Sequence, residues 1–446
     1  MKRLRFPVAP VRLALASLLA LGLLLAPAPA QAKHKAHGGT HTSLHQRFGE
    51  PYRLGAPPPP ARKHRSIAKV RASSDAANDD GKPAAAGKLP ILTREEILAS
   101  DSTRLARIGQ HIIAGFYDFS DAKALVEKKA IAGIFITSHN VAGRTAASVR
   151  SDIDALQDIR KTQGMPPLIV AADQEGGQVS RLSPPLKRQP SLARALAGAK
   201  DDETRRKVVE DYASLQAAEL KRIGVTVNFG PVVDLNNAAT ERDDGETKLR
   251  QRAIAADPYA VAKAAGWYCG TLAKAGLMCT LKHFPGLGRV ARDTHVASGD
   301  ITATEGQLEL NDWVPFRRLM DRPNVATMLG HVRVGVIDKD TPASYSQTII
   351  GHLIRQTWES DGLLITDDFS MGAVTGGKDG IGGASVKAVN AGADLILVSF
   401  SERHLDTVFS ALIRADEDGD LDQKLGEISS ARIARILAGT KAAAEN

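Results

Sequence analysis

Residues 277–295 read LMCTLKHFPGLGRVARDTH and contain the pattern that decides the fold. An apolar run that ends at Leu281 stops at a Lys-His pair, turns through Pro285 and two glycines, and continues as a polar loop that carries Asp293 and His295. A short, continuous apolar run is typical of a parallel strand that is covered on both faces. The stretch therefore predicts a buried strand with reactive groups at its carboxyl end.

The same pattern recurs along residues 91–446, where β-branched runs alternate with segments of helical period. The expected strands cover residues 110–116, 131–137, 167–173, 225–233, 277–283, 325–331, 362–367 and 394–399. Amphipathic segments at 145–163, 202–222, 257–275, 306–320 and 346–359 lie between them. Eight strands that alternate with helices predict an α/β fold of the (β/α)8 TIM-barrel type, in a single catalytic domain, rather than a doubly wound sheet.

Most of the expected strands end in a reactive side chain. The residues at these ends are Asp173, Asp234, Lys282-His283, His331 and Asp367-Asp368. In a barrel the carboxyl ends of the strands form one face, and that face carries the active site. Adjacent residues of a strand point to opposite sides, so only one of the two neighbouring aspartates can face the barrel mouth. We expect Asp367 to be that residue.

These residue types suit the chemistry of a sugar. An ionised carboxylate at Asp367 can attack an anomeric carbon and form a covalent glycosyl intermediate. Asp293 and His295 are two residues apart, which places them on the same side of an extended segment. A carboxylate in that position orients an imidazole for general acid and base catalysis. The sequence thus offers a nucleophile and a proton donor on one face.

Further charged residues are expected to hold the ligand. Asp173 leaves its strand into a glycine pair and can accept sugar hydroxyls, and Arg181 can pair with it or with the ligand. A divalent-metal site is the competing interpretation, because hard cations prefer oxygen ligands. The neighbours of the carboxylates are Lys282, Arg181 and histidines, and this positive company argues against a metal. We expect no metal site.

Five segments together resemble the β-N-acetylhexosaminidase branch of glycoside hydrolase family 3, over about residues 105 to 400. They are Gly133-Ile134-Phe135-Ile136, DQEGGQVSR at 173–181, NFGPVVD at 228–234, the stretch at 281–295, and TDDFSM at 366–371. The order and length of these motifs make the resemblance specific. It implies a (β/α)8 barrel and retaining hydrolysis of terminal, non-reducing β-linked N-acetylglucosamine.

The resemblance also implies a role for each site residue. Asp367 matches the family's nucleophile, and His295 with Asp293 matches its acid/base dyad on a mobile loop. The positions that match sugar-binding residues are Asp173, Arg181, Lys282, His283 and, less closely, Arg252. The substrate implied is a small glycan or a muropeptide, typically a cell-wall fragment. We expect no cofactor and no nucleic-acid partner.

The chain departs from the family pattern in two places. Leu287 stands where most relatives have His, and Ala253-Ile254 follow Arg252 where Ser-Phe is commoner. A β-glucosidase or a glycoside phosphorylase of the same family is an alternative. A phosphorylase is physically reasonable because a His in place of a carboxylate would repel an anionic phosphate acceptor less. So is a non-catalytic envelope protein that binds peptidoglycan, although such a protein would need neither a nucleophile nor a dyad.

Residues 1–32 predict a secretory signal peptide. Basic residues precede an apolar segment, Leu13 to Ala26, that is too short to span a membrane, and Ala30-Gln31-Ala32 supplies the small residues of a cleavage site. We therefore expect cleavage after Ala32 and an exported protein, either periplasmic or secreted. An uncleaved N-terminal anchor is the alternative.

Residues 33–90 predict a disordered spacer, because they combine the Pro57–Pro60 run with Ala-, Gly- and Ser-rich patches and few periodic apolar residues. Residues 1–90 hold 15 Lys and Arg against 4 Asp and Glu, which leaves 43 against 46 in the rest of the chain. The basic charge thus belongs to the leader and the spacer. Peripheral contact with anionic envelope polymers is one interpretation, and a solvated linker is another. The irregular spacing of His34, His37, His41, His45 and His64 predicts no dedicated metal site.

The chain has two cysteines, Cys269 and Cys279. They fall on an expected helix and on the strand that follows it. A domain of this size does not need a disulfide to fold, even in an oxidising compartment. We expect two buried thiols rather than a bridge.

Overall fold

The structure is a computed structural model, and it describes residues 90–236, 247–399 and 401–445. The described residues belong to a compact unit that runs from Ala85 to Asn446. The expected signal peptide, its cleavage site, the five spacer histidines and nearly all of the spacer lie outside the described residues. No helix of the described part is long and apolar enough to cross a membrane.

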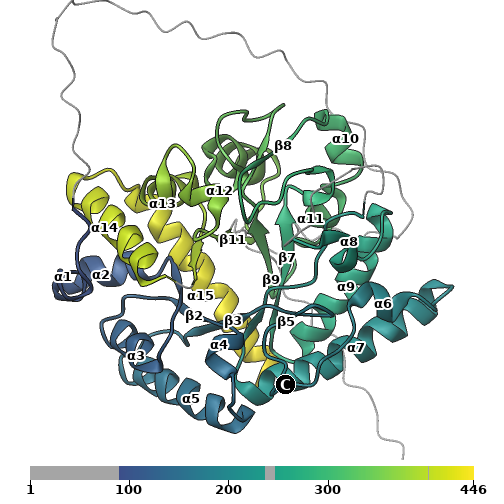
Figure 1. The fold of residues 1–446 in the computed structure, drawn as a ribbon, viewed down its shortest axis with the longest axis horizontal. Helices are drawn as coiled ribbons and strands as arrows, with labels where there is room; N and C mark the ends of the chain where they lie inside the picture. The colour runs from purple at the N-terminus through teal and green to yellow at the C-terminus, as the bar shows by residue number, and fades with distance from the viewer. Residues whose placement is uncertain (1–89, 237–246, 400, 446) are drawn as a thin grey trace, which may run out of the picture. The chain divides into compact units, whose positions relative to one another are not determined.

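Eight parallel strands close into a barrel in the order β1-β12-β11-β9-β7-β6-β3-β2 (Figure 1). These strands are β1 (Ile112–Gly115), β2 (Gly133–Ile136), β3 (Ile169–Ala172), β6 (Val227–Asn228), β7 (Met278–Phe284), β9 (Val325–Leu329), β11 (Leu363–Asp368) and β12 (Leu395–Val398). Each one overlaps one of the eight expected strands. The predicted (β/α)8 TIM-type barrel is therefore confirmed.

Helices surround the strands (Figure 1). They are α1 (Arg94–Ala99), α2 (Ser102–Gly109), α3 (Phe119–Glu127), α4 (Ser138–Val141), α5 (Ala146–Thr162), α6 (Leu192–Leu196), α7 (Asp202–Ile223), α8 (Leu249–Arg252), α9 (Pro258–Lys274), α10 (Glu305–Leu310), α11 (Val314–Leu319), the π-helix η4 (Thr348–Thr357), α12 (Gly372–Thr375), α13 (Gly380–Ala391), α14 (Glu402–Asp418) and α15 (Gln423–Glu445). One 3₁₀ turn, η2 (Leu287–Arg289), follows β7, and another, η3 (Ala343–Tyr345), precedes η4.

Local sequence signals explain where the long helices begin and end. The side chain of Asp257 accepts hydrogen bonds from the backbone of Tyr259 and Ala260, and Pro258 occupies the first turn of α9. Gly224 ends α7 with a φ of 92°, a left-handed conformation that glycine adopts without strain. The helix expected over 306–320 is instead two helices, α10 and α11, because the chain turns sharply at Asn311 (φ −132°, ψ −86°).

Two small sheets lie outside the barrel, and neither was expected. The strands β4 (Gln174–Gly176) and β5 (Val179–Ser180) form an antiparallel hairpin directly after β3. The strands β8 (Gly299–Ile301) and β10 (Val332–Val334) pair in parallel. Both sheets follow barrel strands at the carboxyl end, so they shape the loops of the face that carries the predicted site.

Apolar side chains fill the barrel interior. Phe135 and Phe229 stack there with ring centroids 5.5 Å apart, and residues such as Ile169, Met328 and Leu397 belong to the same buried cluster. Strand residues of the opposite parity pack against the helices in a second buried cluster. Both faces of the strands are therefore covered, as the continuous apolar runs predicted.

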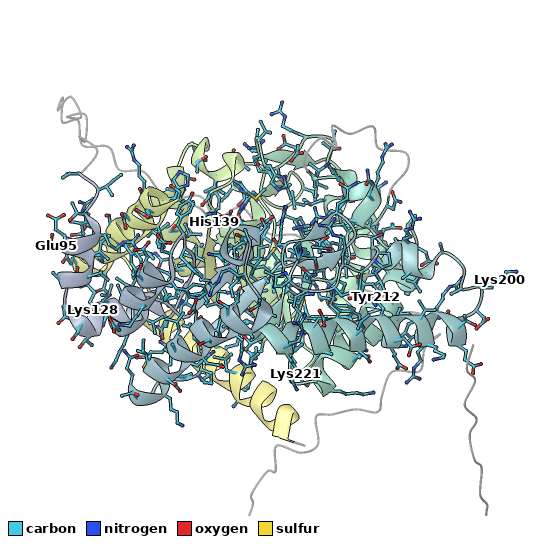
Figure 2. All side chains as sticks on the ribbon, turned by 60° about the horizontal axis from the view of Figure 1, so that its bottom comes forward. Glu95, Lys128, His139, Lys200, Tyr212 and Lys221 are labelled. Carbon is cyan, nitrogen blue, oxygen red and sulfur yellow. A yellow bond between two sulfur atoms is a disulfide. The ribbon has the colours of Figure 1, made fainter. Side chains whose placement is uncertain are left out.

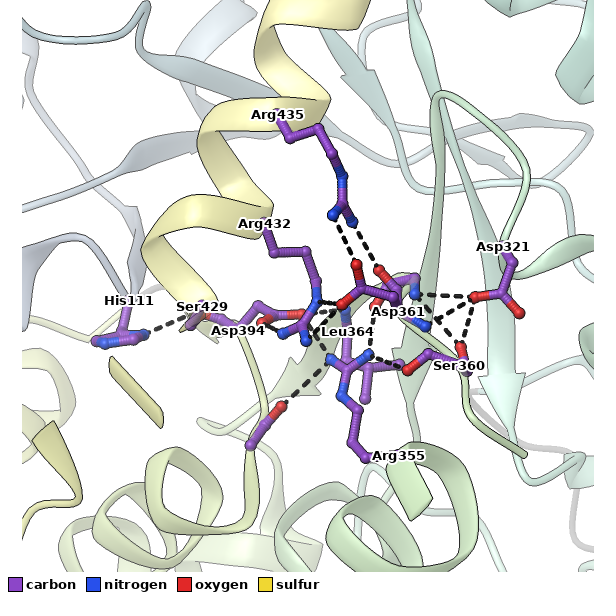
Figure 3. Close-up of polar contacts among 12 residues, drawn as sticks. His111, Asp321, Arg355, Ser360, Asp361, Leu364, Asp394, Ser429, Arg432 and Arg435 are labelled. Atoms are coloured by element: carbon purple, nitrogen blue, oxygen red, sulfur yellow. Dashed lines mark hydrogen bonds and ion pairs between the residues drawn. The ribbon is translucent and has the colours of Figure 1, made fainter. Parts of the chain in front are cut away.

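Helix α15 covers the amino end of the barrel. Its Ile433 joins the interior apolar cluster. Its Arg432 pairs with Asp394, just before β12, at 2.5 Å, and with Asp361, just before β11, at 2.8 Å (Figure 3). Asp394 also accepts a hydrogen bond from Arg355 at 2.9 Å. This end of the barrel is thus closed by packed and paired groups, which leaves the carboxyl end for the site.

The expectation of two free thiols is wrong. Cys269 on α9 and Cys279 on β7 form a disulfide, with their Cα atoms 5.4 Å apart. Helix α9 runs back along the barrel, and a short turn after Lys274 leads into β7, so one face of the helix meets the beginning of the strand. The sequence places the two cysteines on neighbouring elements, but it does not show that their side chains face each other.

Candidate active site

Six of the eight predicted site residues come from four parts of the barrel, and the structure places them on its carboxyl face. Asp173 directly follows β3, Lys282 and His283 lie at the end of β7, and Asp367 lies near the end of β11. Asp293 and His295 belong to the segment that we call the dyad loop, residues 290–298, between η2 and β8. Strand order in the barrel, not closeness in sequence, brings these groups to one face.

A buried ion-pair cluster occupies one side of the site. Nζ of Lys282 lies 2.7 Å from Oδ1 of Asp173 and 2.6 Å from Oε1 of Glu175. Arg252 holds Glu175 through two parallel hydrogen bonds, Nη2 to Oε1 at 2.7 Å and Nε to Oε2 at 2.9 Å. The side chains of Lys282, Glu175 and Arg252 are nearly covered, whereas that of Asp173 is 25% exposed. Asp173 is thus the most exposed member of the cluster.

The cluster stays charged although it is buried. Burial alone would raise the pKa of Glu175, but the charges of Arg252 and Lys282 outweigh it and lower that pKa to about 2. Burial alone would lower the pKa of Lys282, and the carboxylates of Asp173 and Glu175 raise it instead. Two cations and two carboxylates therefore stabilise one another in their charged forms.

The hairpin that carries Glu175 is fixed from the outside by α7. The hydroxyl of Tyr212, labelled in Figure 2, lies 2.8 Å from the main-chain oxygen of Glu175 and 3.0 Å from that of Pro190. Gly176 adopts a φ of 92°, and a Cβ atom there would lie 2.1 Å from the Tyr212 hydroxyl. Glycine at this position is thus required for the hairpin to approach the helix closely.

His283 is oriented by a buried aspartate that follows β6. Its Nδ1 lies 2.7 Å from Oδ2 of Asp234, and its main-chain N–H donates to the same carboxylate. The N–H of Leu287 also donates to Asp234, at 2.6 Å. Because Asp234 accepts from Nδ1, Nε2 is the nitrogen of His283 that can meet a ligand, and no described residue bonds it. Leu287, which had no expected role, contributes its main chain to this anchor and its side chain to the core.

The structure brings Asp293 and His295 together as the sequence predicted. Oδ1 of Asp293 accepts from Nδ1 of His295 at 2.9 Å and from the main-chain N–H of His295 at 3.0 Å. Asp293 is buried, while the side chain of His295 is 40% exposed. The carboxylate thus fixes the ring and its tautomer, and leaves Nε2 as the nitrogen that can exchange a proton with a ligand.

Hydrogen bonds join the dyad loop to the rest of the site on two sides. The N–H of Thr247 donates to Oδ2 of Asp293 at 2.9 Å, and the carbonyl of Thr247 accepts from Nη1 of Arg252 at 2.8 Å. On the other side, the N–H of Gly372 donates to the main-chain oxygen of His295 at 2.9 Å. The dyad loop is therefore held both by the ion-pair cluster and by the segment that follows β11.

Asp367 and Asp368 have different surroundings. Burial raises the pKa of Asp367, but the nearby imidazole of His283, the N–H of Asp368 and the Lys282 ammonium outweigh it, so the pKa is lowered. The carboxylate of Asp368 instead accepts from the main-chain N–H groups of Ser370 and Ser399. Asp367 is thus ionised beside cationic and donor groups, and Asp368 anchors the loop.

The two predicted arginine ligands are placed differently. Arg181 is exposed, and its main-chain N–H donates to the carbonyl of Asp173 at 3.1 Å; its side chain makes no ion pair with another described residue. Arg252 is buried and bonded to Glu175 and Thr247. Sugar binding by either arginine remains a prediction. Among the described ranges, no group of three or more His, Cys, Asp or Glu side chains is placed to hold a metal ion.

Two carboxylates of the site were not among the predicted site residues. Glu175 lies two positions after Asp173, a spacing that puts both on the same side of an extended segment, so the sequence carried a signal for it. Asp234 ends the apolar run Pro231-Val232-Val233, and that position alone marked it as reactive. Thr247 has no such signal, because it contributes main-chain groups only.

Comparison with known proteins identifies relatives for most of the barrel. The family model described as the glycosyl hydrolase family 3 N-terminal domain matches residues 105–436. The β-hexosaminidase LpqI of Mycobacterium tuberculosis is 31% identical over 334 residues, which cover 74% of this chain and 81% of that protein.

Solved structures show the same likeness. A family 3 β-N-acetylglucosaminidase from Paenibacillus sp. FPU-7 superposes with a TM-score of 0.69 at 30% identity, over 76% of this chain and 62% of that one. A family 3 glycosyl hydrolase from Mycobacterium smegmatis superposes with a TM-score of 0.64 at 33% identity, over 76% of this chain and 98% of that one.

Proposed function

The chain belongs to glycosyl hydrolase family 3, and from that premise we propose that it is a retaining exo-β-N-acetylglucosaminidase. It removes terminal, non-reducing β-linked N-acetylglucosamine from cell-wall-derived or related glycans. The names of its relatives, a β-hexosaminidase and a β-N-acetylglucosaminidase, support the sugar class. The observation that carries the proposal is the Asp293–His295 pair on the same barrel face as the ionised Asp367.

In the first step the carboxylate of Asp367 attacks the anomeric carbon of the bound sugar. A bond forms between that carbon and an Asp367 oxygen while the bond to the leaving oxygen breaks, and Nε2–H of His295 protonates that oxygen. Asp293 stabilises the imidazolium from which this proton leaves and keeps its Nδ1–H in place. The step yields a covalent glycosyl ester and the released aglycone.

In the second step a water molecule displaces the Asp367 carboxylate from the glycosyl ester. Neutral His295 removes a proton from the water molecule as its oxygen bonds to the anomeric carbon, and the bond to Asp367 breaks. Two inversions at one carbon give net retention of configuration. The lowered pKa of Asp367 favours this direction, because a stable carboxylate is a good leaving group.

The remaining predicted ligands hold the sugar. Asp173 and Lys282 offer an acceptor and a donor to neighbouring hydroxyls, and Nε2 of His283 offers a third polar contact. Arg181, exposed at the rim, reaches the ligand from the side of the β4–β5 hairpin. Arg252 acts mainly through Glu175 and Thr247 in our proposal.

The setting of the activity is part of the proposal. A signal peptide at 1–32 would export the protein to the periplasm or the exterior, where peptidoglycan fragments and muropeptides are the available substrates. The basic spacer would then allow peripheral contact with the anionic envelope.

One experiment tests the function against its alternatives. The purified protein is given 4-nitrophenyl β-N-acetylglucosaminide or the matching β-glucoside, with and without phosphate, and the anomeric product is followed by NMR. We expect preference for the N-acetylated sugar, β-N-acetylglucosamine as the first product, and no dependence on phosphate. Preference for the glucoside, a sugar-1-phosphate product, or glycan binding without turnover would each contradict the proposal.

A further inference from the structure

His331 is fully buried behind the nucleophile, and the mechanism above does not use it. It follows β9, separated from it by Gly330, and none of its surface is exposed. Its Nε2 lies 2.9 Å from the main-chain oxygen of Asp368, and its Nδ1 lies 2.8 Å from Oγ of Ser344. Both ring nitrogens therefore have a partner, and neither partner is a ligand.

The tautomer of His331 follows from these partners. A carbonyl oxygen only accepts hydrogen bonds, so Nε2 must carry a proton and donate it in the hydrogen bond to the carbonyl oxygen of Asp368. Nδ1 then accepts from the hydroxyl of Ser344. Burial lowers the pKa of His331, and the charge of Asp367 offsets this only in part, so the ring remains neutral. A neutral ring with one donor and one acceptor satisfies both contacts at once.

The contact fixes the chain at the nucleophile itself. The peptide that links Asp367 to Asp368 gives its N–H to Oδ1 of Asp367 at 2.9 Å, and the next carbonyl along, that of Asp368, receives Nε2–H of His331. The ring also packs edge-on against Phe369, with centroids 5.6 Å apart. His331 thus holds the short segment from which the attacking carboxylate projects.

The main chain of the same residue holds the dyad loop. Its carbonyl accepts from Oγ of Ser298 at 3.0 Å, and the next residue, Val332, is paired with Gly299 in the β8–β10 sheet. One residue therefore touches the segment that carries the nucleophile and the segment that carries the acid/base.

We propose that His331 is a positioning residue that sets the distance between the attacking carboxylate and the acid/base dyad, through Nε2–H on Asp368 and its carbonyl on Ser298. It does not contact the substrate. The proposal rests on the function proposed above, since it needs Asp367 to be the nucleophile. Misplacing a reacting group by about 1 Å costs roughly 10²-fold in rate, so the loss of this contact should act on turnover rather than on binding.

Substitution of His331 by Gln or by Asn distinguishes the roles of the two ring nitrogens. The amide of Gln reaches the position of Nε2 and can still donate to Asp368, whereas the amide of Asn reaches only the position of Nδ1. We expect His331→Asn to lower kcat roughly 10²-fold and His331→Gln to lower it less than about 10-fold. The inhibition constant of the product N-acetylglucosamine should stay within a few-fold of wild type in both variants.

His111 provides a matched control. It is also buried, and its Nδ1 lies 2.9 Å from the main-chain oxygen of Asp394, but at the amino end of the barrel (Figure 3). Because His111 makes this contact through Nδ1, the equivalent loss is His111→Gln, whose amide reaches only the position of Nε2. His111→Gln should lower the melting temperature and leave kcat unchanged. If His331→Asn does not fold, Ser344→Ala provides a second variant. It removes the donor to Nδ1 and leaves the ring held by one hydrogen bond, and it should lower kcat by about 10-fold.

Several results would overturn the proposal. A His331→Asn variant with the wild-type kcat would overturn it. Equal losses of kcat in the His331→Asn and His331→Gln variants, in proportion to their lowered melting temperatures, would also overturn it. An equal loss of kcat in His111→Gln would show that any buried histidine has the same effect. Absence of wild-type hydrolysis would instead refute the proposed function, so the two failures are distinguishable.

Discussion

The substitution Asp293→Asn tests the dyad most sharply, because both oxygens of Asp293 accept hydrogen bonds from N–H groups of described residues. Oδ1 accepts two hydrogen bonds from His295, from its main-chain N–H and its Nδ1–H, and Oδ2 accepts one from the N–H of Thr247. Asparagine supplies one acceptor and one donor. In either orientation its NH2 group must therefore face an N–H.

The size of the effect follows from this mismatch. A buried donor left without an acceptor costs about 1–3 kcal/mol, which corresponds to roughly 5- to 150-fold in a rate if it acts fully in the transition state. If the amide turns its NH2 toward His295, Nδ1 must accept and the neutral ring has the wrong tautomer to act as a base. General acid and base catalysis supplies about 10²–10⁴-fold, so we expect a loss of about 10²–10³-fold.

The assay is the dependence of kcat/KM on the leaving group, because kcat/KM reports the steps up to the glycosyl intermediate. Aryl N-acetylglucosaminides with poor leaving groups need protonation, and good ones do not. Asp293→Asn should lose about 10²–10³-fold on the former and under about 10-fold on the latter. The control is Asp300→Asn, which changes an exposed aspartate of β8 that pairs with Arg333 and should leave both unchanged. Equal losses on good and poor leaving groups would refute the acid/base assignment.

Three further predictions concern stability and the loop contacts. Glu175→Gln should be less stable than wild type by about 3 kcal/mol at neutral pH, because folding lowers the pKa of Glu175 from 4.5 to about 2. The stabilisation by the Glu175 carboxylate is present above pH 4.5 and is lost as the pH falls through about 2. Urea titrations across pH should show the difference shrinking toward pH 2, and a constant difference would contradict this. Gly372→Ala places a Cβ atom 2.4 Å from a carbonyl oxygen of the dyad loop, so kcat/KM for substrates with poor leaving groups should fall about 10²-fold. The control is Gly270→Ala, whose Cβ meets no described atom within 4 Å and which should keep the wild-type kcat/KM. Equal activities of the two variants would refute the loop contact. Replacing both Cys269 and Cys279 by Ala should lower the free energy of unfolding by about 3 kcal/mol, because the unfolded chain is no longer restricted by a closed loop with a sequence separation of 10. An unchanged urea midpoint would argue against this prediction.

The barrel could be predicted from sequence because each strand is covered on both faces and therefore reads as one continuous apolar run. The run Leu363-Leu364-Ile365 and its carboxylate end fixed both the position of β11 and the side of the sheet on which Asp367 lies. The strands β8 and β10 were missed for the opposite reason. They are three residues each and pair across loops, so their register depends on where the barrel places His331 and the dyad loop.

Part of the site was also readable, and part was not. The dyad was predicted because Asp293 and His295 are close in sequence, so extended backbone is enough to bring them together. The bonds of Glu175 with Arg252 and of Thr247 with Asp293 join residues 77 and 46 positions apart. Such contacts, like the Cys269–Cys279 bridge, depend on how helices and loops pack on the barrel, which no local pattern records.

The central claim is that Asp367 forms a covalent bond with the sugar. An N-acetylglucosaminyl fluoride with a second fluorine on the sugar should trap this ester, because fluoride is a good leaving group and the second fluorine slows hydrolysis of the ester. Peptide mass spectrometry of the digested enzyme then locates the modified residue. We predict a single glycosylated peptide, with the modification on Asp367, and no adduct in Asp367→Asn. An adduct on Asp368, Asp173 or any other residue, or inactivation without an adduct, would contradict the account.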